Sequence, residues 1–403
     1  MRTVSESTEG RQAMTRRGLL GAGLALTLAG CNSTAVEMPE FGSTAPNPQP
    51  TPGAPGPTVG ETLGSGPVRV GMILPLTQNS APSPVGVSMR NAAQLAIDEF
   101  SGPYVTLMIE DDRSTSEGAA QAAQAELGAG AELLLGPVYA TDVRQAASVA
   151  RAASKPMIAF STDVGVASPG VYLLSFLIEG YVDRIAQFAV SRGKKTFAVM
   201  APQSEYGNIA VAEFQQIVGR LNAPVAVVAR YASGDAQSAA RQVAAAGGQI
   251  DALFIPEQAD GMPAVATALA ANGVKTQLLG TGVWNDARVL RLPQLQGAWF
   301  AAPDNAGFNA MAQRYKAKFG AEPTRLATLS YDAVTLAAAL GRNAAGTERY
   351  GQAGLTSVSG FNGVDGVFRF RSDGTNERGL AVMEIEDNAA TVISPAPRSF
   401  AAG

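Results

Sequence analysis

The chain has 403 residues, with 30 basic and 34 acidic side chains, no histidine and a single cysteine. The lack of histidine and of a second thiol excludes Ser-His-Asp and Cys-His nucleophiles, disulfides and histidine-based metal sites. No G-x-S-x-G, G-x-x-x-x-G-K or S-x-x-K motif surrounds a candidate nucleophile, although carboxylate or lysine chemistry remains formally possible. We therefore expect a protein that is not an enzyme, uses no cofactor and binds no metal.

The N-terminus resembles a bacterial lipoprotein signal. A basic opening precedes an apolar stretch from Gly18 to Ala29, and the small residues Ala29 and Gly30 stand directly before Cys31. This pattern predicts a signal peptide over residues 1–30, cleavage before Cys31 and lipidation of its thiol. The segment 15–20 also resembles a twin-arginine export signal, so the twin-arginine and general secretion routes both stay open. Either route leads to the periplasmic side of the bacterial cell envelope.

The composition changes after the signal. Removal of residues 1–30 would leave 26 basic and 32 acidic residues and a net charge of −6, which argues against nucleic acid as a partner. Residues 31–67 are rich in proline, glycine and small polar residues and poor in large apolar ones. This composition predicts a disordered tether, with the acyl chains on Cys31 as the contact to the membrane.

From Val68 onward, short apolar runs alternate with alanine-rich segments of helical spacing, a pattern typical of parallel sheets. The first series predicts strands at Val68–Leu74, Val105–Glu110, Ala131–Leu135 and Pro156–Ala159, and helices at Pro84–Phe100, Ser116–Gly128 and Asp142–Ala153. The spacing of Ser114 and Glu117 predicts a capping box before the second of these helices.

A second series follows after residue 195, so we expect two lobes. It predicts strands at Thr196–Met200, Val225–Ala229, Ala252–Ile255, Gln277–Leu279 and Ala298–Ala302, and helices at Tyr206–Leu221, Ala236–Ala246 and Pro263–Ala271. Two helices, Ala306–Phe319 and Leu326–Leu340, then follow without an intervening strand. The alternating segment 367–371 and the segment 380–385 predict a terminal hairpin.

Over residues 68–387 the chain resembles the type I periplasmic solute-binding proteins, specifically the branched-chain amino-acid (Leu/Ile/Val-type) receptors of ABC transporters. The resemblance is carried by Val70–Thr77, Leu135-Gly136-Pro137, Pro156–Thr162, Glu205-Tyr206-Gly207, Gly366–Phe370 and Asp373-Gly374.

The resemblance implies an α/β fold of two Rossmann-like lobes with parallel sheets, joined by three hinge crossings. Lobe one would comprise residues 68–175 and 304–350, and lobe two residues 176–303 and 351–395, so that the two late helices return to lobe one and the hairpin to lobe two. It also implies a monomer that closes over an amino acid or similar solute and delivers it to an ABC permease.

Ligands of parallel α/β sheets bind beyond the carboxyl ends of the strands, where helix N-termini present free N–H groups. The polar and aromatic residues in such loops are Thr77, Gln78, Tyr139, Phe160, Ser161 and Thr162 in lobe one, and Tyr206, Glu257, Gln258 and Trp284 in lobe two. Hydroxyl and N–H groups suit a carboxylate, and the aromatic rings suit an apolar portion. Trp284 is expected to face the cleft.

Structural roles compete for several of these loop positions. Ser161 and Thr162 could instead cap the next element, and Tyr206 could cover a helix end. Gly136-Pro137 is expected to shape its loop and to bind only through backbone groups. Glu110-Asp111-Asp112 is expected to form a solvated rim.

One loop departs from the pattern of amino-acid receptors, in which an acid after the strand at 277–279 pairs with the ligand ammonium. Here that loop reads Gly280-Thr281-Gly282-Val283-Trp284-Asn285-Asp286. The ammonium would fall to Glu257 or have no acidic partner. Together with the lipoprotein signal and the tether, this loop also resembles the penicillin-binding-protein activators, lipoproteins of the same superfamily that bind cell-wall synthases. Transport and regulation of peptidoglycan synthesis therefore both stay open.

The anchor prediction is tested by Cys31→Ser. The substitution removes the thiol to which the acyl chains attach, so acylation should be lost and the precursor should stay uncut or the protein unanchored. Metabolic labelling with a fatty acid and membrane fractionation measure this, with Ser33→Ala as the control that keeps the thiol. Continued acylation of the Cys31→Ser protein would contradict the assignment.

Overall fold

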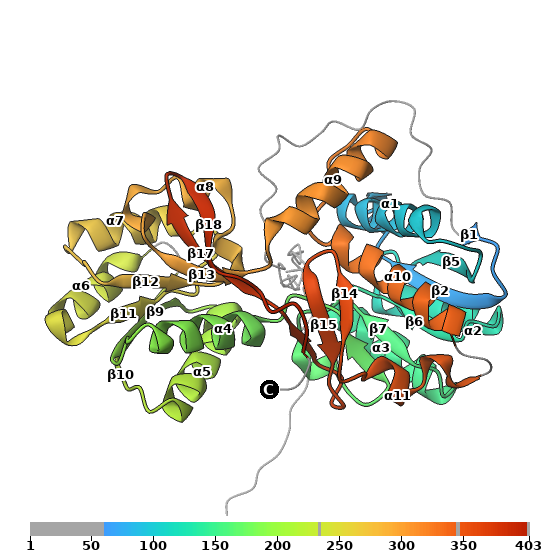
Figure 1. Ribbon diagram of the computed structural model, residues 1–403, viewed down its shortest axis with the longest axis horizontal. Helices are drawn as coiled ribbons and strands as arrows, with labels where there is room; N and C mark the ends of the chain where they lie inside the picture. Colours follow the sequence, from blue (N-terminus) through green and yellow to red (C-terminus); the bar gives the residue numbers. More distant parts are fainter. Residues whose placement is uncertain (1–59, 233–234, 344–346, 401–403) are drawn as a thin grey trace, which may run out of the picture. The chain divides into compact units, whose positions relative to one another are not determined.

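The computed structural model describes residues 60–232, 235–343 and 347–400. The predicted signal peptide and Cys31 lie outside these residues. Two separate sheets, of six and seven strands, make up most of the strand content, and most of their neighbouring strands run parallel. The predicted two-lobe α/β fold is therefore confirmed (Figure 1). Among the described residues, no helix has both the length and the apolar character needed to cross a membrane.

Lobe one is built on the six-stranded sheet, in the order β1-β5-β2-β6-β7-β8. Helices α1 and α10 cover one face and α2 and α3 cover the other (Figure 1). Its elements are β1 (Glu61–Gly64), β2 (Val68–Leu74), β3 (Thr77–Gln78), β4 (Ala81–Pro82), α1 (Pro84–Glu99), β5 (Val105–Asp111), α2 (Ser116–Gly128), β6 (Leu133–Leu135), α3 (Ala140–Ala152), β7 (Met157–Ala159), η1 (Val164–Val166), β8 (Val171–Leu173), α9 (Asn305–Phe319), α10 (Ala327–Asn343), η5 (Thr347–Tyr350) and α11 (Gln352–Leu355).

The two covered faces explain the sequence of lobe one. Strand β2 is an almost continuous apolar run because both of its faces are buried; Val70, Ile73 and Leu74 are all fully buried. Helices α2 and α3 present alanines at helical spacing, such as Ala119, Ala122 and Ala123, and these small side chains allow the helices to pack closely on the sheet.

Lobe two is built on the seven-stranded sheet, in the order β10-β9-β11-β12-β13-β17-β18. Helices α4 and α5 cover one face, and α6 and α7 cover the other (Figure 1). Its elements are α4 (Ile178–Ser191), β9 (Phe197–Pro202), α5 (Glu205–Arg220), β10 (Val225–Tyr231), α6 (Ala236–Ala246), η2 (Gly247–Gln249), β11 (Ala252–Phe254), α7 (Met262–Ala271), β12 (Gln277–Gly280), η3 (Gly282–Trp284), α8 (Ala287–Leu290), η4 (Pro293–Leu295), β13 (Trp299–Ala302), β17 (Ala381–Glu386) and β18 (Ala389–Ser394).

The chain passes between the two sheets three times: between β8 and α4, between β13 and α9, and between the three-stranded sheet and β17. The three-stranded sheet consists of β14 (Phe361–Gly363), β15 (Gly366–Phe370) and β16 (Asn376–Arg378). The return of α10 to lobe one agrees with its packing on α1 and its contacts with β5 and β6. The assignment of residues 351–378 to lobe two is corrected, because α11 and the three-stranded sheet contact lobe one and only β17 and β18 join the sheet of lobe two. The other lobe boundaries remain a proposal.

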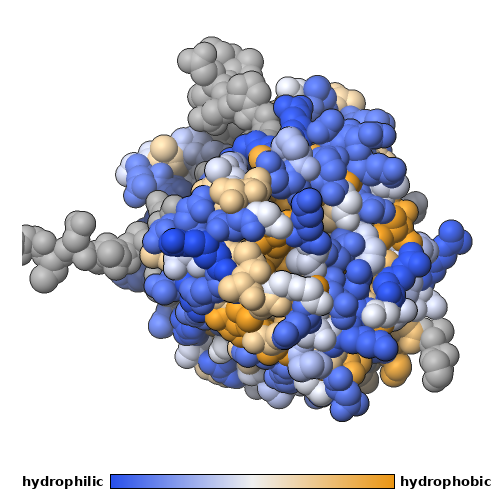
Figure 2. Space-filling model, turned by 90° about the vertical axis from the view of Figure 1, so that its left-hand side faces the viewer, coloured by the Kyte–Doolittle hydropathy of each residue, from blue (hydrophilic) through white to orange (hydrophobic). Residues whose placement is uncertain are grey.

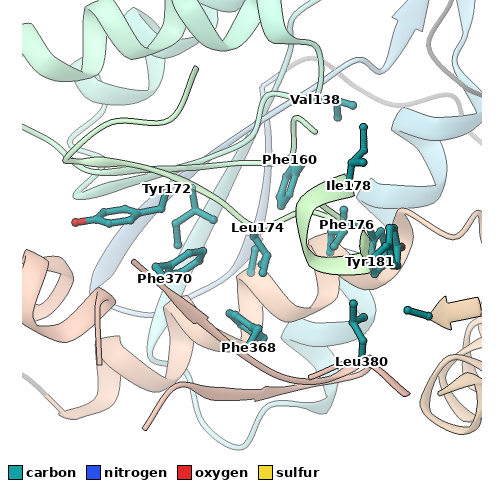
Figure 3. Close-up of a cluster of buried hydrophobic side chains, with 14 of the residues drawn as sticks. Val138, Phe160, Tyr172, Leu174, Phe176, Ile178, Tyr181, Phe368, Phe370 and Leu380 are labelled. Carbon is teal, nitrogen blue, oxygen red and sulfur yellow. The ribbon is translucent and has the colours of Figure 1, made fainter. Parts of the chain in front are cut away.

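The predicted terminal hairpin is wrong. Strand β15 pairs with β14 and β16, whereas the segment predicted as its partner, 380–385, falls largely in β17 and joins the sheet of lobe two beside β13. The three-stranded sheet instead contacts the β8 edge of lobe one: Leu173 N donates to Gly374 O at 2.8 Å, and the rings of Tyr172 and Phe370 lie 5.4 Å apart (Figure 3). Both candidate partners alternate with period two, so the sequence pattern does not choose between them.

Two further local predictions are corrected. Residues 61–64, assigned to the tether, form β1 and pair antiparallel with β5; Leu63 is buried, and Arg90 Nε donates to Glu61 Oε2 at 2.8 Å. The predicted capping box is also wrong, because the N-cap of α2 is Thr115, whose Oγ1 accepts from Gly118 N at 3.0 Å. Ser114 instead adopts a left-handed backbone conformation (φ 53°) and donates to Thr77 O.

The end of lobe two seen in Figure 2 is mostly hydrophilic, with apolar patches between polar side chains. Among the described residues, the large apolar side chains that are exposed are Leu221, Val228, Val358 and Val392. Val228 lies on β10, the edge strand of the seven-stranded sheet.

A stacked trio of phenylalanines provides the stability test for lobe two. Phe214 of α5 stacks on Phe254 with ring centroids 4.4 Å apart and meets Phe197 edge-on at 5.5 Å, and all three are fully buried. Phe214→Ala should lower the free energy of unfolding by about 3–5 kcal/mol, because it leaves a cavity between rings that cannot collapse. Urea unfolding measures this. Val358→Ala, at a residue 77% exposed, is the control and should change little; a similar loss in both variants would contradict the packing argument.

Candidate functional site

In lobe one the loop after β2 is fixed by Asp111 at the end of β5. Thr77 donates from its N–H to Asp111 Oδ1 at 3.1 Å and from Oγ1 to Asp111 Oδ2 at 2.6 Å, and Leu76 N donates to the same carboxylate. Gln78 is exposed on the short β3–β4 hairpin. The Thr77 hydroxyl therefore holds its loop, and Gln78 is the more accessible of the two predicted residues.

Two further carboxylates, those of Asp112 and Asp142, lie near Tyr139. Asp112 and Asp142 are 0% and 2% exposed, and the Oδ2 atom of each is buried without a hydrogen-bond partner among the described residues. Burial raises the pKa of Asp112 to about 7, helped by the nearby carboxylates of Asp142 and Asp111 and opposed by the Ser114 N–H. Burial, then Asp112 and Asp142, raise the pKa of Tyr139 as well.

This burial corrects the expectation that Glu110-Asp111-Asp112 forms a solvated rim. Asp111 and Asp112 are buried because backbone N–H groups of the loops turn inward and bind them. Leu76 N and Arg113 N donate to Asp111, and Ser114 N donates to Asp112. In the described part of the chain, no group of three or more His, Cys, Asp or Glu residues is arranged to hold a metal ion.

The loop after β7 places three predicted residues differently. Phe160 is 2% exposed and packs in the core beside Leu174 (Figure 3). Ser161 is also buried, and its Oγ accepts from Asp163 N at 3.1 Å, so it caps the following turn. Thr162 is half-buried. On the neighbouring loop, Gly136 has a φ of 86°, and a side chain there would meet Ile73 O at 2.0 Å, which explains the glycine beside Pro137.

In lobe two the loops after β9, β11 and β12 meet around Tyr206. The Tyr206 hydroxyl lies 2.6 Å from Thr281 Oγ1. Burial raises the pKa of Tyr206; the bond to Thr281 opposes this shift, and Tyr181, Glu179 and Glu257 add to it. The half-buried Tyr206 is thus surrounded by polar groups from three loops and from α4.

Both carboxylate oxygens of Glu257 already have donors within lobe two. Tyr231 Oη donates to Oε2 at 2.6 Å and Gln258 N donates to Oε1 at 2.8 Å. Glu257 is 8% exposed, and burial raises its pKa. The half-buried Gln258 keeps its Nε2 without a partner among the described residues.

The expectation that Trp284 faces the cleft is wrong in this structure. Its side chain is fully buried in the core of lobe two, directly beneath Gly280, where a Cβ atom would lie 2.1 Å from the indole. The 3₁₀ turn η3 folds the ring back under the end of β12. Glycine at position 280 provides the space for the ring, so this glycine has a packing role.

Sequence analysis missed Glu179, in the first turn of α4. Its Oε2 atom is buried and has no hydrogen-bond partner among the described residues. Burial raises its pKa, the Glu179 backbone N–H opposes this, Glu213 and Asp163 raise it further, and Arg371 lowers it. The signal that could have found it is an acid in the first turn of a helix directly after a crossing. Helix α4 itself was not predicted.

The two edges therefore offer complementary chemistry. Lobe one presents the half-buried Thr162 and the N-terminus of α3, where Tyr139 is an N-cap without a side-chain capping bond and the backbone N–H groups suit an anion. Lobe two and the start of α4 present Tyr206, Thr281 and a carboxylate oxygen on Glu179 that lacks a partner. Such a set suits a small zwitterion. The fold and this chemistry define a two-lobed solute-binding protein.

Comparison with known proteins agrees with this class. A family model described as periplasmic binding protein matches residues 67–390, and the chain belongs to this family. The family implies an extracytoplasmic location. No curated protein matches the sequence.

Solved structures share the fold at low sequence identity. A protein from Rhodospirillum rubrum named as a branched-chain amino-acid ABC transporter has a TM-score of 0.72 and 20% identity, covering 81% of this chain and 99% of that one. A substrate-binding protein from Desulfitobacterium hafniense in complex with Leu has a TM-score of 0.61 and 19% identity, covering 81% and 99%. A solute-binding protein from R. palustris in complex with benzoate has a TM-score of 0.57 and 19% identity, covering 82% and 97%.

The raised pKa of Asp112 gives a pH test of the lobe-one edge. Between about pH 4 and about pH 7 the folded state keeps a proton that the unfolded state releases, so the free energy of unfolding should fall as the pH rises through this window. Asp112→Asn should flatten this fall by up to ~1.4 kcal/mol per pH unit. Urea unfolding at several pH values measures it. The control Asp387→Asn changes an exposed turn residue; an unchanged slope in Asp112→Asn would contradict the assignment.

Proposed function

We propose that this chain is the non-catalytic solute-binding component of an ABC importer for amino acids of the branched-chain type or a similar small solute. The observation that carries the proposal is the partnerless, buried Oε2 of Glu179 near Tyr206. A free amino acid brings an ammonium group that loses water on binding, and a buried charge without a counter-charge is strongly unfavourable. Glu179 supplies that counter-charge.

The remaining residues take complementary roles in this proposal. The N-terminus of α3, with Tyr139 and Thr162, binds the ligand carboxylate, while Thr77 and Ser161 hold the loops that line the site. Tyr206 binds the amino group beside Glu179 or covers the apolar side chain. Glu257 orients Tyr231, with which it shares a 2.6 Å hydrogen bond. Phe160 and Trp284 support the binding loops from the two cores, and Gln78 contacts the solute at the rim.

The proposal includes the cellular setting predicted from the sequence. The lipidated Cys31 anchors the protein on the periplasmic side of the membrane, and the tether gives the two lobes the reach to approach a permease. The protein acts as a monomer, since one chain supplies both edges of the site. Closure of the lobes over the solute creates the surface that the permease binds.

One observation favours a second candidate function, that of a penicillin-binding-protein activator that regulates peptidoglycan synthesis. The loop after β12 offers no free acid: Asp286 caps α8 and pairs with Arg288 at 2.8 Å, and the oxygens of Glu257 are both engaged. If Glu179 binds no ligand, none of the acids discussed in the described part of lobe two is free to pair with an ammonium, and a protein partner becomes the better explanation of the two-lobe architecture.

Isothermal titration with leucine, isoleucine and valine tests the transport proposal. We expect micromolar binding that Glu179→Gln weakens by about 2 kcal/mol or more, as for a buried hydrogen bond between charged groups. Glu205→Gln, an exposed acid in the first turn of α5, is the matched control and should bind as the parent does. Glu257→Gln should have a smaller effect, because its carboxylate already accepts two hydrogen bonds.

The outcomes separate the two candidates. Binding of an amino acid in the titration that is weakened by Glu179→Gln supports the transport proposal. No heat with any amino acid, together with capture of a cell-wall synthase by the lipidated protein, would reject amino-acid transport in favour of the activator. Binding that depends on Glu257 and not on Glu179 would move the ammonium site to the loop after β11.

A further inference from the structure

A small cavity lies where the first and third crossings meet. Its lining residues are Phe176 and Leu177 of the first crossing, Gly180 and Tyr181 of α4, Asn376 and Arg378 of β16, and Leu380 of the third crossing. The volume of the cavity is about 10 Å³, at the lower end of the ~10–15 Å³ that one buried water molecule needs. No carboxylate lines the cavity, and the ring of Tyr181, which does line it, lies against Gly282 of the loop after β12.

Arg378 brings hydrogen-bond donors to this cavity that the protein does not use. Its Nε donates to Ser175 O at 3.0 Å, which joins the third crossing to the first. Its Nη1 and Nη2 atoms are buried and have no hydrogen-bond partner among the described residues. The guanidinium lies 4.8 Å from the centre of the Phe176 ring and 5.4 Å from that of Phe368. These rings hold the group in place but accept no ordinary hydrogen bond from its edge.

The N-terminus of α4 reaches the same cavity from the other side. The N-cap residue Leu177 has an apolar side chain and makes no side-chain capping bond, and Gly180 and Tyr181 of the first turn line the cavity. The first turn of this 14-residue helix has N–H groups without a partner inside the helix and a positive dipole end. One of them, the N–H of Glu179, is bound by that residue's own carboxylate. Two independent sources of donors, one charged and one from the backbone, therefore meet at one small space.

Two guanidinium groups, those of Arg378 and Arg325, share the carboxylates of Asp365 and Asp332, so at mildly acidic pH one ionised carboxylate faces two positive charges. Asp365 is paired with Arg325, whose guanidinium lies 5.1 Å from the Phe176 ring. Asp332 is the second acid nearby; its Oδ1 accepts from Val364 N at 2.7 Å. Burial raises the pKa of Asp332 to about 7, with Arg378 and Arg325 opposing and Asp365 adding to the shift. Tyr181, the other titratable group facing Arg378, stays neutral.

We propose that the cavity is a site for a small monovalent anion, chloride, held between the guanidinium of Arg378 and the N-terminal turn of α4. A bound chloride would accept hydrogen bonds from Arg378 Nη1 and Nη2 and from the backbone of the first turn of α4. It would join β16 to α4 and so stabilise the meeting point of the crossings. This site goes beyond the proposed function and does not depend on the identity of the solute.

Diffraction gives the direct test. Crystals of the full chain grown at about pH 6 with sodium bromide in place of chloride should show an anomalous bromide peak between Arg378 and the first turn of α4. Bromide has the charge of chloride and a measurable anomalous signal, whereas a water molecule has none. A well-ordered water at this position with no anomalous peak would overturn the proposal. This measurement needs no variant, so it does not depend on the folding of any mutant.

Thermal unfolding in solution gives the second test. Replacing sodium gluconate by sodium chloride at constant ionic strength and about pH 6 should raise the unfolding midpoint of the parent protein, because chloride binds the folded state. Arg378→Gln should lose this rise. The matched control Arg184→Gln changes another half-buried arginine, on α4 itself. Arg184 donates to the backbone oxygen of Leu380, which lines the cavity, but does not line it itself, so this variant should keep the rise.

Comparison of the two variants shows whether the chloride-dependent rise in the unfolding midpoint comes from the cavity or from the protein as a whole. A chloride-dependent rise that is lost in Arg378→Gln and kept in Arg184→Gln supports the site. No rise in the parent protein, or an equal rise in Arg378→Gln, would show general salt effects and contradict it.

Discussion

The connection between the two lobes is stabilised by Phe176, whose ring lies against two guanidinium groups. Arg325, which precedes α10, and Arg378, in β16, lie 5.1 and 4.8 Å from the centre of this ring. Phe176 belongs to the first crossing, Arg378 directly precedes the third, and Arg325 lies between α9 and α10, so one aromatic side chain joins two crossings to the helices of lobe one. Each cation–π contact contributes about 1–2 kcal/mol when desolvated. A hinge motion that changes the first or third crossing must therefore move residues that contact this ring.

Several buried carboxylates lie where the chain has to bind something or bend, whereas Glu126 of α2, both of whose oxygens lack a partner among the described residues, lies against Gly71 of β2. Asp112 and Asp142 lie beneath the loops of lobe one, Glu179 lies at the start of α4, and Asp332 lies beside the crossings. Each has an oxygen that is buried without a hydrogen-bond partner among the described residues. Such groups lower stability unless a partner arrives, and they are kept where function requires them. The apolar cores of the two lobes offset this cost.

The regular part of the fold could be predicted from the sequence because its pattern is local. Strand β2 and helices α2 and α6 have the predicted boundaries, since an apolar run or an alanine stripe identifies an element that is covered on known faces. Strand pairing is not local. Strand β15 pairs with β16, and β17 pairs with β13, because the third crossing lies between β16 and β17. The period-two alternation of these strands does not show where that crossing lies.

The sequence predicted which loops carry the residues of the candidate site better than it predicted what each side chain does there. The loops at the carboxyl ends of the strands do carry Tyr139, Thr162, Tyr206 and Glu257 as half-buried or nearly buried side chains. A loop position does not reveal which way a side chain points, and Trp284 turned into the core because Gly280 leaves room for it. Glu179 was missed because it lies in no such loop. Its importance comes from the first crossing, which brings the start of α4 close to Tyr206.

The first turn of α4 links the two sites that we propose. Glu179 directs a carboxylate toward the surroundings of Tyr206, while Leu177, Gly180 and Tyr181 of the same turn face the cavity at Arg378. A rigid helical turn cannot move toward one site without moving relative to the other. If solute binding shifts this turn, it changes the space beside Arg378, and the anion must then change the affinity for the solute by the same factor. The coupling would be carried by one turn of backbone and would need no path through either core.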